Sequence, residues 1–99
     1  MLAISKKVGE DLKEIEIENT LEATQEFVDG YIEVISVTTD YGIFLVICNE
    51  EGRLRGMPRN CTIDGIDFVG DILICGEDGE DFGDCPLTID ELKDYIKEV

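Results

Sequence analysis

Two neighbouring stretches decide the fold: YIEVISVT (Tyr31–Thr38) and GIFLVIC (Gly42–Cys48), joined by the residues 39–41. Both stretches are rich in β-branched residues and the connection between them is short, which predicts an antiparallel hairpin. The second stretch shows no alternation of apolar and polar residues. We therefore expect its strand to be central in a sheet and covered on both faces.

Two further strands are expected before this hairpin. Met1–Ser5 is a short apolar run, and Glu14–Glu18 reads EIEIE, a strict alternation with a period of two. Ile15 and Ile17 then lie on one side of the second strand and its three glutamates on the other. This pattern is typical of a half-buried strand.

A helix is expected between the EIEIE strand and the hairpin. Asn19 or Thr20 is its predicted N-cap, and Glu22 lies three residues after Asn19, as a capping box requires. The helix should run to about Asp29 and end at Gly30, because glycine commonly follows the last turn of a helix.

The second half of the chain contains weaker strand signals and one strong helix signal. We expect a brief pairing of residues 53–55, a loop over residues 57–60, an edge strand over residues 62–67, a strong strand over residues 68–75 with a bulge at Gly70 and Asp71, and an acidic loop over residues 76–84. Leu87, Thr88, Glu91 and Leu92 combine a hydrophobic staple with a capping box, which predicts the start of a final helix. The predicted apolar face of that helix consists of Ile89, Leu92, Ile96 and Val99.

This order of elements predicts a single domain over residues 1–99. Its expected class is α+β: a mostly antiparallel sheet of about five strands with two helices on one face.

The charge of the chain restricts its partners. It has 24 acidic residues, 8 basic residues and no histidine, a formal net charge of −16, while its hydrophobic content of 43% is that of an ordinary folded domain. We expect no direct binding to nucleic acid or to an acidic membrane, because both require lysine and arginine on the protein surface. A basic protein surface is the natural complement.

The expected compartment is the cytoplasm. The apolar run at Met1–Lys7 is too short for a signal peptide, and no stretch has the length of a membrane span. The four cysteines, Cys48, Cys61, Cys75 and Cys85, are accordingly expected to be thiols.

Five segments resemble a known family. They are ENTLE (Glu18–Glu22), GYIE (Gly30–Glu33), CNEEG (Cys48–Gly52), GMPRN (Gly56–Asn60) and VGDILI (Val69–Ile74). The chain is similar, from about residue 14 to residue 95, to a family of small uncharacterised domains from bacteriophages and conjugative elements, mainly of Gram-positive gut bacteria.

The resemblance implies a setting and not a reaction. Members of that family have no established activity and occur beside, or within, large mobile-element proteins thought to help incoming DNA survive host defences. An antirestriction or counter-defence role is what this neighbourhood implies. Family members often carry a basic residue directly after the Pro-x-Asn segment, where this chain has Cys61.

No residue pattern in the chain predicts an enzyme, a cofactor or a metal site. The lack of histidine removes the common triads and most catalytic zinc sites, and there is no Cys-x-x-Cys pair and no glycine-rich phosphate loop. The acidic loop fails the EF-hand pattern at Phe82 and Ile89, which favours a hydrated loop over a calcium site. Cys85 precedes the last helix, but its acidic neighbours favour an inert thiol.

Six carboxylates form the main candidate binding surface. They lie in two stripes: Glu14, Glu16 and Glu18 on the second strand, and Glu22, Glu26 and Asp29 on the first helix. Carboxylates repeated every 6 to 7 Å, the approximate spacing of alternate strand residues or of one helical turn, resemble the phosphates of a duplex. The leading hypothesis is a non-enzymatic inhibitor or accessory factor that binds a basic host protein by imitating DNA. The simpler alternative is that both stripes are solvated faces of amphipathic elements.

The second candidate surface is the loop of Pro58, Arg59 and Asn60. Arg53, Arg55 and Arg59 are three of the eight basic residues and lie within seven positions. Under the alternative hypothesis the chain is a small interaction module that binds through this Gly-x-Pro-x-Asn loop, and its acidity serves only solubility. A structural role for the arginines at a sheet edge is also open. The oligomeric state is left between a monomer and a weak dimer.

Overall fold

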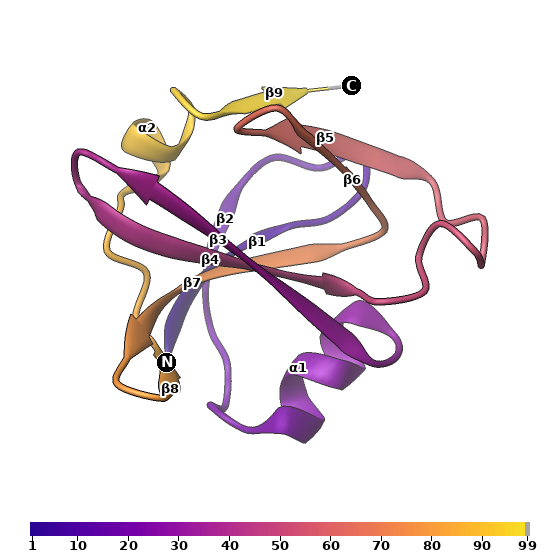
Figure 1. Cartoon of the computed structure of the whole chain (residues 1–99), viewed down its shortest axis with the longest axis horizontal. Coiled ribbons are helices and arrows are strands. Elements are labelled where there is room, and N and C mark those ends of the chain that lie inside the picture. The colour runs from indigo at the N-terminus through magenta and orange to yellow at the C-terminus, as the bar shows by residue number, and fades with distance from the viewer. Residues whose placement is uncertain (99) are drawn as a thin grey trace.

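The computed structural model describes residues 1–98, which form two antiparallel sheets and two helices (Figure 1). The elements are β1 (Leu2–Lys6), β2 (Lys13–Glu16), α1 (Leu21–Val28), β3 (Ile32–Thr39), β4 (Gly42–Asn49), β5 (Arg59–Ile63), β6 (Ile66–Val69), β7 (Ile72–Asp78), β8 (Asp81–Gly83), α2 (Ile89–Leu92) and β9 (Ile96–Glu98). The main sheet has the strand order β2-β1-β7-β4-β3, with β8 paired to β7, and the small sheet has the order β6-β5-β9. The predicted α+β class with a mostly antiparallel sheet is confirmed. Neither helix in the described chain has the length and apolar character needed to cross a membrane.

The predicted hairpin is the centre of the fold. β3 pairs with β4 along its whole length, from Ile32 opposite Asn49 to Thr39 opposite Gly42. On its other side β4 pairs with β7, and every residue from Phe44 to Asn49 is buried. The expectation that this strand is central and covered on both faces is confirmed.

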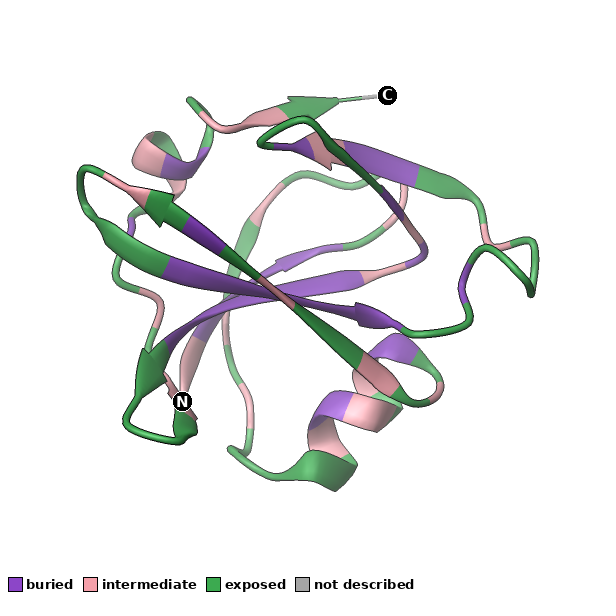
Figure 2. Ribbon diagram, in the orientation of Figure 1, coloured by how far each residue is buried: buried purple, intermediate pink, exposed green. Residues whose placement is uncertain are grey.

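The main sheet separates two cores (Figure 2). Alternate residues of β4, such as Phe44 and Val46, pack against the small sheet and α2. The residues between them, Leu45 and Ile47, pack against α1 through Val28. The molecule therefore has three layers: α1, the main sheet, and the small sheet with α2.

The expectation that both helices lie on one face is wrong, because α1 and α2 pack on opposite faces of the main sheet. α2 is also shorter than predicted, although its Thr88–Glu91 capping box is confirmed. Its last turn ends where Ile96 enters β9 and pairs with Ile63 of β5. Ile96 has the spacing of a helical core residue, but the open edge of the small sheet gives its backbone hydrogen-bond partners. Val99 lies outside the described residues.

The predicted strand over residues 68–75 is two strands in different sheets, and its expected bulge is a crossover. Gly70 has a φ of 74°, which an L side chain rarely adopts, and its N–H donates to the carbonyl of Pro58 (2.8 Å). The chain turns there from β6 in the small sheet to β7 in the main sheet.

Three shorter predictions also need correction. Residues 53–55 lie in a turn and not in a strand, and Arg59 and Asn60 belong to β5 and not to a loop. The acidic segment over residues 76–84 is the hairpin of β7 and β8. Of the three, only β5 depends on a distant segment of the chain, because it pairs with β9.

The ends of α1 are fixed by specific contacts. The hydroxyl of Thr20, one of the two predicted caps, accepts a hydrogen bond from the Ala23 N–H (3.1 Å). At the other end Asn49 Nδ2 donates to the carbonyls of Val28 and Asp29 (both 3.0 Å). Because Asn49 ends β4, this side chain holds the C-terminus of α1 onto the main sheet.

Candidate functional site

Four of the six predicted acidic residues line one groove. It lies between α1 and the segment that runs from the end of β2 to the helix, and it has a volume of about 620 Å³. The carboxylates on its walls are Glu16, Glu18, Glu22 and Glu26, and Asp71 and Lys7 also line it. Apolar side chains, Ile17 and Phe27, lie between the carboxylates. We call this surface the acidic groove.

Helical spacing on one wall and contacts with the chain terminus on the other explain how the two stripes are held. Glu22 and Glu26 are four residues apart on α1 and share a face of that helix. The other wall is held by the chain terminus: the Met1 amino group donates to the carbonyl of Ile17 (2.6 Å), and the Ile17 N–H donates to the carbonyl of Met1 (3.0 Å).

A third contact fixes the segment that enters the helix. Asn19 Nδ2 donates to the carbonyl of Phe82 in β8 (2.7 Å), and Thr20 caps α1. The acidic groove is thus built on a fixed backbone and not on a free loop. Groups held in this way lose little conformational entropy when a partner binds.

The carboxylates of the acidic groove are exposed and mostly unpaired. Glu16 lies 3.6 Å from the terminal amino group, an exposed pair of little energetic weight. Glu18, Glu22 and Glu26 form no ion pair with any residue from 1 to 98. They present a concentrated negative potential that reaches about 8 Å into solvent at physiological salt.

The structure separates the remaining two acidic residues from the groove. Glu14 lines a different hollow, with Leu87, Thr88 and Asp90 at the start of α2. Asp29 follows α1 in a left-handed conformation, and its Oδ2 lies 2.9 Å from Nη2 of Arg55. Asp29 is therefore neutralised locally, and β2 ends at Glu16, so Glu18 does not continue a regular strand repeat.

The residues of the second predicted binding surface do not all lie at the surface of the protein. Pro58 and Arg59 are exposed, but Asn60 is only 2% exposed. Asn60 Nδ2 donates to the carbonyls of Lys6 (2.7 Å) and Gly70 (2.8 Å), and so it ties β5 to β1 and to the crossover. The Asn60 side chain is a structural bridge, which leaves Pro58 and Arg59 as the accessible part of this surface.

Each of the three clustered arginines has a partner in its own surroundings. Arg53 donates to the carbonyl of Asp67 (2.8 Å), Arg55 binds Asp29, and Arg59 lies 3.0 Å from the Asp67 carboxylate. Asp67 also accepts a hydrogen bond from the Thr62 hydroxyl (2.6 Å). This bond and the charge of Arg59 lower the pKa of Asp67.

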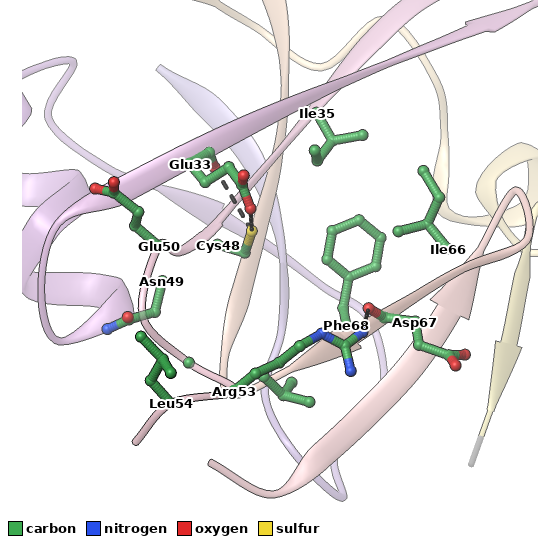
Figure 3. Close-up of a pocket in the computed structure, with 12 residues that line it drawn as sticks. Glu33, Ile35, Cys48, Asn49, Glu50, Arg53, Leu54, Ile66, Asp67 and Phe68 are labelled. Carbon is green, nitrogen blue, oxygen red and sulfur yellow. Dashed lines mark hydrogen bonds between the residues drawn. The ribbon is translucent and has the colours of Figure 1, made fainter. Parts of the chain in front are cut away.

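A smaller hollow of about 190 Å³ lies on the opposite side of the sheet from α1 (Figure 3). Residues of β3, the turn after β4, and β6 line it, including Ile35, Arg53, Leu54, Ile66 and Phe68. At its base the thiol of Cys48 donates to the carbonyl of Glu33 (3.6 Å). Burial, with a contribution from Glu33, raises the pKa of Cys48 to about 11, so this thiol stays protonated at neutral pH.

The other thiols are equally unreactive. Burial raises the pKa of Cys61 to about 11 and that of Cys75 to about 12, and it also raises the pKa of the half-buried Cys85. No cysteine has the lowered pKa that a nucleophile or a metal ligand would show. The four cysteines are free thiols.

Sequence reasoning missed two buried polar residues that join separate elements of the fold. Asn49 fixes α1, and Lys6 is a buried lysine (1% exposed) whose Nζ lies 3.2 Å from a carboxylate oxygen of Glu98 in β9. Asn49 had a weak signal, since an asparagine that directly follows a buried strand often makes backbone contacts. Lys6 had none, because its partner is distant in the sequence.

Comparison with known proteins gives a family and no activity. No curated protein and no solved structure matches the chain. A family model does match, over residues 1–99, and the chain belongs to that family, described as Domain of unknown function (DUF3846).

Proposed function

We propose that this chain is a non-enzymatic binding protein that presents its acidic groove to a basic surface on a partner protein. The observation that carries the proposal is the convergence of Glu16, Glu18, Glu22 and Glu26 on one groove with a fixed backbone. Solvated faces alone do not require two separate stripes to meet. Three of these carboxylates also lack an ion-pair partner among residues 1–98.

The finer form of the proposal is imitation of DNA. Successive turns of α1 set Glu22 and Glu26 about 6 Å apart, and Glu16 and Glu18 supply a second row across the groove. A basic cleft that evolved for phosphates would be attracted to such rows through long-range steering and released counterions. Ile17 and Phe27 between the rows add apolar contact area.

The resemblance to domains from phages and conjugative elements supports a biological setting for this binding. In that setting the partner would be a basic, DNA-binding host protein in the cytoplasm, such as a restriction factor, and the chain would be an inhibitor or accessory factor in counter-defence. The net charge of −16 supports a partner of opposite sign.

The first test is a tagged pull-down from a related bacterial lysate at low and high salt, with bound proteins identified by mass spectrometry. A DNA-binding protein held at low salt and released at high salt is the expected result, because exposed charge pairs are screened. A partner that stays bound at high salt would contradict an electrostatic interface.

The second test locates the binding surface. The quadruple variant Glu16→Gln, Glu18→Gln, Glu22→Gln and Glu26→Gln changes the net charge from −16 to −12. A matched control makes the same change at exposed glutamates elsewhere: Glu10, Glu50, Glu51 and Glu80. The groove variant should weaken binding by about 10-fold or more, through lost steering, and the control much less. Equal losses would show that only net charge matters.

The alternative function is an interaction module that binds through Pro58 and Arg59. Its support is the position of Arg59, which is exposed yet fixed by Asp67 and Thr62. Under this alternative Arg59→Ala abolishes binding while the groove variant retains it. The two variants in one binding assay therefore decide between the two functions.

A further inference from the structure

β3 forms an open edge of the main sheet. It is the last strand in the order β2-β1-β7-β4-β3, and no strand within residues 1–98 pairs with its outer side. β3 is eight residues long and contains a single charged residue, Glu33. Most edge strands carry lysine, proline or a bulge that prevents pairing with another chain, and β3 has none of these.

Exposed apolar side chains gather beside this edge. Seven large apolar residues are exposed in the described chain: Leu21, Tyr31, Val34, Tyr41, Ile43, Leu54 and Ile66. All except Leu21 belong to the β3–β4 hairpin and the residue before it, or line the hollow beside β3. Val34 and Ile43 lie on the α1 side of the sheet, and Leu54 and Ile66 lie on the other side, where Figure 3 shows Ile66 beside Ile35.

We propose that β3 is a homodimer interface, at which two copies pair their β3 strands antiparallel around a two-fold axis perpendicular to the sheet. Such pairing uses the same patch twice, and it joins the two main sheets into one. It also places apolar residues on both faces of the new seam beside those of the second copy.

The sequence of β3 fits pairing centred on Ser36. In this register Ile35 lies opposite Val37 of the second copy, and Glu33 lies opposite Thr39. No carboxylate then faces another carboxylate across the seam, which is the arrangement that would destabilise a strand pair. Cross-strand pairs of β-branched residues such as Ile35 and Val37 are among the favourable ones.

The position of β3 answers the objection that two copies of charge −16 repel each other. One wall of the acidic groove follows β2, which is at the opposite edge of the main sheet, and Figure 1 shows β3 in front of the sheet and β2 behind it. The other wall is α1, which packs mainly against β4 and β7. A continuous sheet built from two five-strand paths separates the two β2 strands by nine intervals of about 4.8 Å, roughly 43 Å. That distance is several times the Debye length at physiological salt, about 8 Å.

This geometry predicts that salt has opposite effects on self-association and on binding of a basic partner. Because the residual repulsion between copies is screened by salt, self-association should strengthen by several-fold between about 50 mM and about 300 mM NaCl. Binding of a basic partner to the acidic groove should weaken over the same range. Sedimentation velocity across a wide range of protein concentration measures the first equilibrium. A chain that stays monomeric at the highest concentration and salt overturns the proposal and leaves the edge open to a strand of another protein.

Substitutions locate the interface. Ser36→Glu sets two carboxylates opposite each other in the proposed register, and we expect it to weaken the dimer by about 10-fold or more. Leu21→Glu is the matched control, since it makes the same charge change at an exposed apolar residue away from β3, and it should retain the dimer. Equal effects of the two variants would overturn the assignment to β3.

A charge swap tests the register. A mixture of the Ser36→Glu and Ser36→Lys variants should form a heterodimer that is tighter than either variant with itself, which native mass spectrometry can measure. A mixture that stays monomeric overturns the pairing of Ser36 with itself. Amide hydrogen exchange of the unmodified chain is an independent check, because it needs no variant that could fail to fold. Protection of the β3 amides should rise with protein concentration, and protection of the β2 amides should not.

Discussion

The two edges of the main sheet differ in the way that they handle charge. β2 is four residues long, and the glutamates at its end belong to the acidic groove, where they are mostly unpaired. β3 is eight residues long with one charged residue. Two carboxylates near β3 are neutralised, since Asp67 is held by Arg59 and Asp29 by Arg55, whereas Glu33 of β3 has no ion-pair partner among residues 1–98.

This difference shows that a net charge of −16 is not spread evenly over the fold. Unpaired carboxylates protect the β2 edge from pairing with another strand and give it long-range attraction for cations. Arg55 and Arg59 reduce the repulsion near β3 by pairing with Asp29 and Asp67. We infer that one edge is built for a basic partner and the other for a strand.

The largest expected effect destabilises both edges together, because buried cysteines lie in the cores on both faces of the main sheet. The pKa values of Cys48, Cys61 and Cys75 are raised from 9.0 to between about 11 and about 12, mainly by burial. A raised pKa means that the folded chain holds these protons more tightly than the unfolded chain does. The stability from the protonated thiols is therefore complete below pH 9 and is lost as the pH rises through the folded values.

At pH 10 this loss is about 1 kcal/mol for each thiol, and a few kcal/mol for the three together, in the free energy of unfolding. Urea denaturation at pH 8 and pH 10 measures it. The control is the triple variant Cys48→Ala, Cys61→Ala and Cys75→Ala, whose stability should change much less over this interval. A wild-type chain that is equally stable at both pH values would contradict burial as the cause.

The next largest effect concerns α1, which forms one wall of the acidic groove and is held at its end by Asn49. Asn49→Ala removes the two hydrogen bonds to the end of α1 and a third that Asn49 Oδ1 accepts from the Glu51 N–H (2.8 Å). The buried carbonyl of Val28 then loses this donor, while the carbonyl of Asp29 keeps its bond from Arg55, and the loss should cost about 2 kcal/mol in the free energy of unfolding. Hydrogen exchange should accelerate most in α1.

Asn19→Ala is the control for this prediction, because Asn19 also donates to a backbone carbonyl but is exposed. It should cost about 1 kcal/mol or less. Equal losses in the two variants, measured by urea denaturation, would show that Asn49 has no special part in holding α1.

The extent to which the sequence predicts this fold can be judged from particular residues. The hairpin and the central position of β4 follow from patterns within a few neighbouring residues. The Thr88–Glu91 capping box was found for the same reason. Gly70 was misjudged because the apolar run on both sides of it does not reveal that its two halves belong to different sheets.

The candidate site shows the same limit. Helical spacing predicted that Glu22 and Glu26 share a face, but it could not place the glutamates near β2 across the groove from them. Asn60 is predicted in a binding loop because it belongs to the Gly-x-Pro-x-Asn segment, but its acceptor, the carbonyl of Lys6, is 54 residues away. Contacts between distant segments decide both outcomes, and the local sequence carries no record of them.

The third effect is the salt dependence of the two binding equilibria, one at each edge, measured in the same sample. Raising NaCl from about 50 mM to about 300 mM should weaken binding of a basic partner by about 10-fold or more, while self-association becomes several-fold tighter. Sedimentation velocity with a labelled partner follows both equilibria together. Two equilibria that shift in the same direction would show that the edges do not differ electrostatically as we describe.

The smallest effect tests how the carboxylates near β3 are neutralised. The pKa of Asp67 is lowered first by the hydrogen bond from Thr62 and next by the charge of Arg59. Thr62→Val and Arg59→Ala should therefore each raise this pKa toward the ordinary value of an aspartate carboxyl, and NMR titration of the Asp67 carboxyl carbon measures both. A lowered pKa stabilises the fold above the unfolded value, and this contribution disappears as the pH falls through the folded value. Either variant should accordingly flatten the acid side of the stability profile slightly. If Arg59→Ala leaves the pKa of Asp67 unchanged, the arginine does not neutralise this carboxylate, and the local neutralisation that distinguishes the β3 edge is wrong.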